Sequence, residues 1–151
     1  MRKFLVWINL LPVAIHISAQ DVMPSEIPFH FDNTGKIEYN FFLQFKENGF
    51  TGICIIKQGD GEMIGSIINE FGVKAFDFVY KINSGKIRLL NVIAFMDKWY
   101  IKKIVMEDWK YLLAYPNVKK QSKKRKVVRM DDGGIVLENT RHRIRYTLTP
   151  F

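Results

Sequence analysis

The sequence predicts an α+β fold that is mainly β, a curved antiparallel sheet or half-barrel of about eight strands covered by one amphipathic helix. Short segments rich in aromatic and β-branched residues are separated by turn signals of Gly, Asn and Asp. At Asp97 the spacing of the apolar residues changes from every second residue to every third or fourth. The helix predicted there has an apolar stripe, and that stripe needs an apolar surface to cover.

The predicted strands follow from alternation and from turn residues. In residues 36–45, apolar side chains occupy every second position and so lie on one face of a strand. Asn48-Gly49 predicts a hairpin turn, because both residues tolerate positive φ. Residues 87–95 are almost continuously apolar, which indicates a strand covered on both faces. The predicted strands occupy residues 36–45, 50–57, 63–69, 75–82, 87–95, 126–130, 135–138 and 143–148.

A helix is predicted over residues 97–114. The Asp97 carboxylate can cap its first turn, and Pro116 ends it. The opposite face is rich in lysine and is predicted to be solvated. We expect the helix to pack across the concave side of the sheet through its apolar stripe, which consists of Ile101, Ile104, Val105, Trp109, Leu112 and Leu113.

Residues 1–20 are predicted to be a signal peptide, because a basic start precedes an apolar stretch and a small-residue exit. The apolar stretch is shorter than the about 20 residues of a membrane-spanning helix, and it contains Pro12. We expect cleavage after Ala19 or Gln20; the alternative is that this stretch forms a buried helix of the domain. The predicted location is the periplasm or outer envelope, without a lipid anchor, because no cysteine lies at the cleavage point.

The rest of the chain is predicted to be an extended leader, residues 21–35, and a single domain, residues 36–151. A composition of 48% hydrophobic and 25% charged residues is typical of a globular protein. Cys54 is the only cysteine, so an intramolecular disulfide is excluded, and its apolar surroundings predict a buried side chain. The sequence leaves open whether the chain is a shortened form of a longer protein.

The formal net charge of +8 is concentrated in a predicted connection between helix and strand, residues 119–126. This connection could bind anionic lipid headgroups, phosphates or acidic partners, or it could be a solvated link with no partner. Nucleic acid is not predicted as a partner, because an exported protein rarely meets it. The candidate residues for an anionic surface are Lys119, Lys120, Lys123, Lys124, Arg125 and Lys126.

The sequence predicts no catalytic, cofactor-binding or metal-ligating residues, and therefore no enzyme. Beyond the predicted signal peptide only His30 and His142 remain as histidines, one in the proline-rich leader and one in a basic strand, and neither has an evident carboxylate to orient it. Zinc would need three or four ligands. Gly59-Asp60-Gly61 is too short for a phosphate-binding loop and is predicted to be a hairpin turn.

Residues 50–113 resemble the central part of small exported envelope proteins of bacteria that have a lipoprotein-carrier (LolA/LolB-like) half-barrel. The resemblance lies in Phe50, Gly52, Ile53, Ile55 and Lys57, in Asn69, Glu70, Phe71 and Gly72 before Phe76, Asp77 and Phe78, and in Trp109, Leu112 and Leu113 of the predicted helix. It implies an open barrel whose apolar concave face, covered by a helix, holds acyl chains.

Two functions are therefore expected. The first is a non-enzymatic envelope protein that binds or shields an apolar ligand such as an acyl chain inside the half-barrel. The second is an interaction module that docks an envelope partner or an anionic surface through residues 119–126. The sequence does not predict an oligomeric state. The residues expected to line the apolar site are Phe41, Leu43, Phe45, Phe76, Phe78, Tyr80, Trp99, Trp109 and Leu113.

Overall fold

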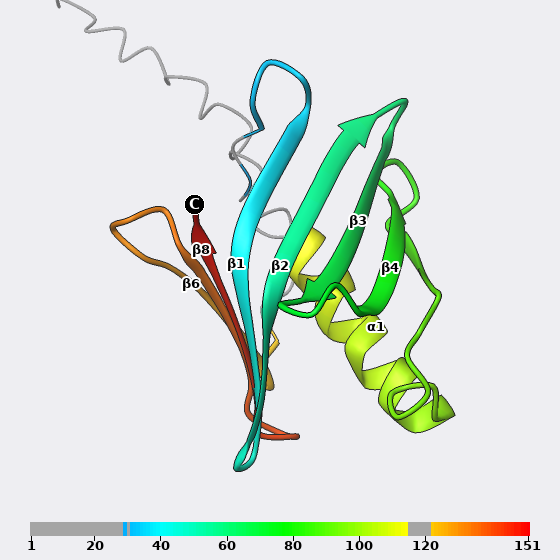
Figure 1. Ribbon diagram of the computed structural model, residues 1–151, viewed down its shortest axis with the longest axis vertical. Coiled ribbons are helices and arrows are strands. Elements are labelled where there is room, and N and C mark those ends of the chain that lie inside the picture. The colour runs from blue at the N-terminus through cyan, green and yellow to red at the C-terminus, as the bar shows by residue number, and fades with distance from the viewer. Residues whose placement is uncertain (1–28, 30, 115–121) are drawn as a thin grey trace, which may run out of the picture.

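The computed structural model describes residues 29, 31–114 and 122–151 (Figure 1). The predicted signal peptide, residues 1–20, lies outside the described residues, and so do most of the leader, residues 21–35, and the first part of the basic connection, residues 119–121. The predictions for these segments therefore remain predictions.

The described chain forms one antiparallel sheet in the order β5-β4-β3-β2-β1-β8-β7-β6. Two meanders build it, because β1 to β5 follow one another, as do β6 to β8, and the pair β1–β8 joins the two. The sheet curls into a half-barrel, which confirms the predicted fold class. The strands are β1 (Lys36–Phe45), β2 (Asn48–Gly59), β3 (Glu62–Asn69), β4 (Lys74–Lys81), β5 (Lys86–Leu90), β6 (Arg125–Arg129), β7 (Ile135–Asn139) and β8 (Ile144–Pro150).

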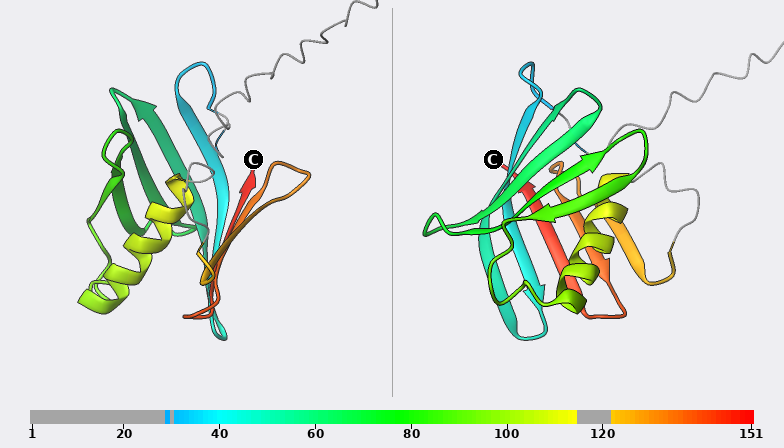
Figure 2. Two further views of the ribbon diagram at one scale, coloured as in Figure 1. Left: turned by 180° about the vertical axis from the view of Figure 1, so that it is seen from behind. Right: turned by 90° about the vertical axis from the view of Figure 1, so that its right-hand side faces the viewer.

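The helix α1 (Trp99–Ala114) lies between β5 and β6 in the chain, and these strands form the two edges of the sheet. Figures 1 and 2 show α1 on the concave side, with the sheet curling around it. Its buried residues include Val105, Trp109, Leu112 and Leu113, as the stripe predicted. Cys54 is buried in the same core, also as predicted, and burial raises the pKa of its thiol.

The turn between β1 and β2 differs from the prediction by two residues. Phe45 pairs with Asn48, so the turn consists of Lys46 and Glu47, and Lys46 adopts a φ of 54°. Asn48 and Gly49 belong to β2 instead. A Cβ atom on Gly49 would lie 2.9 Å from the ring of Phe42, so the missing side chain makes room for an aromatic neighbour. Cross-strand packing, and not the turn, explains this glycine.

The strand predicted at residues 87–95 is shorter than predicted, and it is not covered by other strands on both sides. β5 ends at Leu90, because Asn91 has a φ of 49° and donates a side-chain hydrogen bond to Asp77 Oδ2 at 2.6 Å. β5 is also an edge strand, paired with β4. The apolar residues Val92 and Ile93 pack against the core from the segment that leads to α1. Continuous apolar character therefore arose from a strand followed by an irregular packed segment.

The helix begins at Trp99, two residues after the predicted start. The Asp97 carboxylate, expected to cap the first turn, accepts a hydrogen bond from Lys102 Nζ at 2.6 Å. The described residues include no helix that is both long and apolar enough to cross a membrane.

Candidate functional site

The space between α1 and the sheet is filled by aromatic side chains around Trp109. The indole is fully buried, and its ring centroid lies 4.8 Å from that of Phe78 and 5.7 Å from that of Phe76. The rings of Phe41 and Tyr146 lie 6.1 and 6.4 Å away. These spacings are those of aromatic rings in direct contact. The interior beneath the helix is therefore packed around one tryptophan.

The structure brings six of the nine predicted lining residues together. Leu43 is partly buried against this group. The side chains that are buried in one cluster are Phe41, Phe76, Phe78, Tyr80, Trp109 and Leu113.

The other two lining residues, Phe45 and Trp99, are exposed, which corrects their assignment to the interior. Phe45 is the last residue of β1, is 43% exposed, and has Lys46 Nζ 5.4 Å from its ring centroid. Trp99 is the first residue of α1 and is 79% exposed. Phe45 continues the alternation of Phe41 and Leu43, whereas Trp99 lies outside the apolar stripe of α1, and both residues stand at the ends of their elements.

A buried polar cluster fixes α1 to the second meander. The Asp108 carboxylate is fully buried and accepts hydrogen bonds from Arg125 Nε at 2.6 Å, Asn139 Nδ2 at 2.7 Å and Tyr146 Oη at 3.0 Å. These donors come from β6, β7 and β8. The cluster therefore joins the helix to three successive strands.

Burial dominates the electrostatics of this cluster. It raises the pKa of the Asp108 carboxyl, while the hydrogen bonds and the charge of Arg125 oppose that rise. Burial also raises the pKa of the Tyr146 hydroxyl well above its usual value. The cluster was not predicted, because no structural role was assigned to Asp108 from the sequence. A charged residue adjacent to the apolar stripe position Trp109 was the available signal.

Arg125 is held inside the molecule, which corrects its assignment to an anionic surface. Besides Asp108, it contacts Glu107 through Nη2 at 3.1 Å, and its side chain is largely buried. Lys123, Lys124 and Lys126 are exposed. The backbone N–H of Ser122 donates to Tyr111 Oη at 3.4 Å, so this part of the basic connection lies beside the second half of α1. Lys119 and Lys120 lie outside the described residues.

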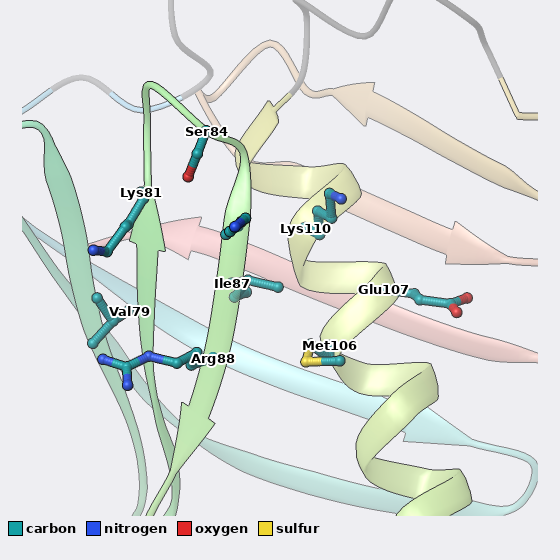
Figure 3. Close-up of a pocket in the computed structure, with 9 residues that line it drawn as sticks. Val79, Lys81, Ser84, Ile87, Arg88, Met106, Glu107 and Lys110 are labelled. Atoms are coloured by element: carbon teal, nitrogen blue, oxygen red, sulfur yellow. The ribbon is translucent and has the colours of Figure 1, made fainter.

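An open pocket of about 820 Å³ lies between the β4–β5 hairpin and α1 (Figure 3). In Figure 3, Ile87 points toward the helix and Met106 toward β5, whereas Lys81 and Arg88 point away from the helix. Because the pocket is open to solvent, it would leave much of an apolar ligand exposed. The residues that line it are Val79, Lys81, Ser84, Lys86, Ile87, Arg88, Met106, Glu107 and Lys110.

The titratable residues considered for catalysis do not form a site in the described part of the chain. The backbone N–H of His142 donates to Asn139 Oδ1 at 3.2 Å in the turn between β7 and β8. His30 lies outside the described residues. Within the described ranges, no three His, Cys, Asp or Glu side chains are grouped so that they could hold a metal ion.

No family model and no curated protein matches this sequence. The lipoprotein-carrier resemblance therefore rests on the sequence features alone.

The role of Arg125 can be tested by substitution. We expect Arg125→Gln to lower the free energy of unfolding by about 3–5 kcal/mol, because it leaves the Asp108 charge buried without its cation. Lys126→Gln, an exposed neighbour on β6, should change it by less than about 0.5 kcal/mol. The double variant Asp108→Asn/Arg125→Gln should recover part of the loss. Urea unfolding followed by Trp fluorescence measures all three, and equal midpoints for Arg125→Gln and wild type would show that Arg125 is not structural.

Proposed function

We propose that the protein is a non-enzymatic exported envelope protein that docks onto an anionic surface of the envelope. The observation that supports this proposal is the packing of Trp109, which occupies the space where a carried ligand would otherwise sit. Because the half-barrel is solid, we expect its outer surface to bind the partner. That surface is basic, with a formal net charge of +8 for the whole chain.

The proposed docking residues are the exposed lysines of the basic connection. Lys123 and Lys124 are exposed near α1, and Lys126 is exposed on β6, on the face of the strand opposite to Arg125, whose side chain is paired with Asp108. Lys119 and Lys120 add to the same charge cluster by sequence. Each lysine near an anionic membrane contributes ~1 kcal/mol, an attraction that salt weakens.

Export is part of the proposal and depends on residues 1–20. A basic start, an apolar stretch and a small-residue exit support cleavage by the secretion machinery. We expect mass spectrometry of the protein from its native cells to find an N-terminus at Gln20 or Asp21, in the periplasmic or outer-envelope fraction. An intact Met1 on cytosolic material would contradict export.

Docking through the basic connection predicts a salt-sensitive interaction. The variant Lys123→Gln/Lys124→Gln/Lys126→Gln should bind isolated envelope material roughly a hundredfold more weakly than wild type, at about 1 kcal/mol for each lysine. Lys57→Gln on β2 is the control, because Lys57 is also exposed but lies on another strand, away from the basic connection. Retention measured by co-sedimentation at increasing salt would refute this role if the triple variant and wild type behaved alike.

A second candidate function is binding of an apolar ligand such as an acyl chain. The observation that favours it is the convergence of six predicted lining residues beneath α1 on the concave face. In this proposal the helix moves away and the ligand replaces Trp109 against the sheet.

Ligand binding predicts a molecule that leaves with organic solvent. Protein recovered from its native compartment should yield an acyl-containing extract, and it should enhance the fluorescence of an apolar dye. The variant Arg125→Gln, which loosens the attachment of α1, should bind more dye than wild type. A clean extract together with no dye response in either protein would exclude this function.

A further inference from the structure

The face of α1 that is turned away from the sheet begins with large exposed aromatic side chains. Trp99 is 79% exposed, Tyr100 is 46% exposed, and Phe95, just before the helix, is 59% exposed. The rings of Trp99 and Tyr100 are in edge contact, with centroids 5.9 Å apart. Trp99 and Tyr100 therefore form an exposed aromatic pair, with Phe95 exposed four residues before Trp99, and exposed apolar surface of this kind marks interaction sites.

The same face continues with lysines. At 3.6 residues per turn, Trp99, Lys103 and Lys110 fall in one stripe along the helix, and the buried Trp109 and Val105 lie about 80° and 120° around the helix from Trp99. Lys103 and Lys110 are exposed, as is Lys98 next to Trp99. The outer face of α1 thus has an aromatic end and a basic stripe.

The acidic residues near this face form ion pairs, and Glu107 shares its cation, Arg125, with the buried Asp108. Asp97 is 2.6 Å from Lys102 Nζ, and Glu107 is 3.1 Å from Arg125 Nη2. Lys98, Lys103 and Lys110 have no acidic partner in the part of the chain that the structure describes. The face therefore carries a net positive charge that an anionic partner would complement.

We propose that this face of α1 lies flat on the surface of an anionic phospholipid bilayer, with Trp99 and Tyr100 at the level of the headgroups. Tryptophan and tyrosine favour the membrane interface because their rings are amphipathic, and lysines on an interfacial helix attract anionic lipids. A second copy of the chain would bring another strongly positive surface, which disfavours self-association. The inference rests on the proposed docking function and names the surface and the residues that meet it.

Co-sedimentation with vesicles tests the assignment. Wild-type protein should bind vesicles of phosphatidylglycerol and phosphatidylcholine more tightly than vesicles of phosphatidylcholine alone. The variant Phe95→Ser/Trp99→Ser/Tyr100→Ser should bind the anionic vesicles at least about tenfold more weakly, through lost apolar burial. The variant Lys98→Gln/Lys103→Gln/Lys110→Gln should lose about fivefold for each lysine, and this loss should shrink as salt is added.

Control variants elsewhere on the surface test whether binding depends on this face of α1 and not on any exposed aromatic or lysine side chain. Phe151→Ser removes an aromatic that is 71% exposed at the C-terminal end, and Lys57→Gln removes an exposed lysine of β2. Both should bind like wild type. In protein cleaved after Ala19 or Gln20, which lacks Trp7, brominated lipids should quench part of the wild-type fluorescence, and that part should vanish in Trp99→Phe, because Trp109 is buried and only Trp99 can meet the bromines.

The outcomes distinguish this inference from the docking proposal. Equal binding of wild type and the aromatic variant, or an absence of quenching specific to Trp99, would overturn the inference. If Lys123→Gln/Lys124→Gln/Lys126→Gln alone lost its binding to envelope material, docking would stand and this face would not be the contact. If the aromatic variant instead dissolved a dimer seen by sedimentation, the face would bind a second copy, and the inference would fall.

Discussion

The structure depends on the packing of one indole, that of Trp109 on α1, against strands from both parts of the curved sheet. Trp109 contacts Phe76 and Phe78 on β4. It also contacts Phe41 on β1 and Tyr146 on β8, the pair of strands that joins the two meanders. An open half-barrel has a concave apolar face that must be covered, and here one side chain reaches strands of both meanders. Burying a tryptophan removes ~200 Å² from water, which stabilises the fold by ~5 kcal/mol.

The neighbouring residue sets how the helix lies on that face. Asp108 binds donors on β6, β7 and β8, so the helix is tied to the second meander by polar contacts, while Trp109 packs apolar surface. Because Arg125 is used in this attachment, the basic connection loses a cation that its composition suggested was available. The other side of α1 is left facing outward, and there the exposed aromatics and lysines gather. One helix thus has a structural face and an outer face to which we assign recognition.

Periodicity predicted the strands, the helix and the concave packing, because alternation and stripe spacing are local properties that burial enforces. Two local predictions, the position of the turn between β1 and β2 and the length of β5, were wrong because tertiary contacts decide them. Gly49 makes room for Phe42 across the hairpin, and the hydrogen bond between Asn91 and Asp77 accompanies the end of β5. The site was harder to predict. The partner of Asp108 is 17 residues away at Arg125, and no spacing rule connects a helix to a strand beyond a loop.

Hydrogen exchange at the Trp109 indole tests the central claim most directly. Its Nε1 is buried and has no hydrogen-bond partner among the described residues, so only burial protects it from solvent. If the helix and sheet form one solid unit, this proton exchanges with the same opening free energy as the slowest backbone amides of β1 and β2. Rapid exchange of the indole proton while those amides stay protected would mean that α1 opens alone, and it would contradict a solid half-barrel.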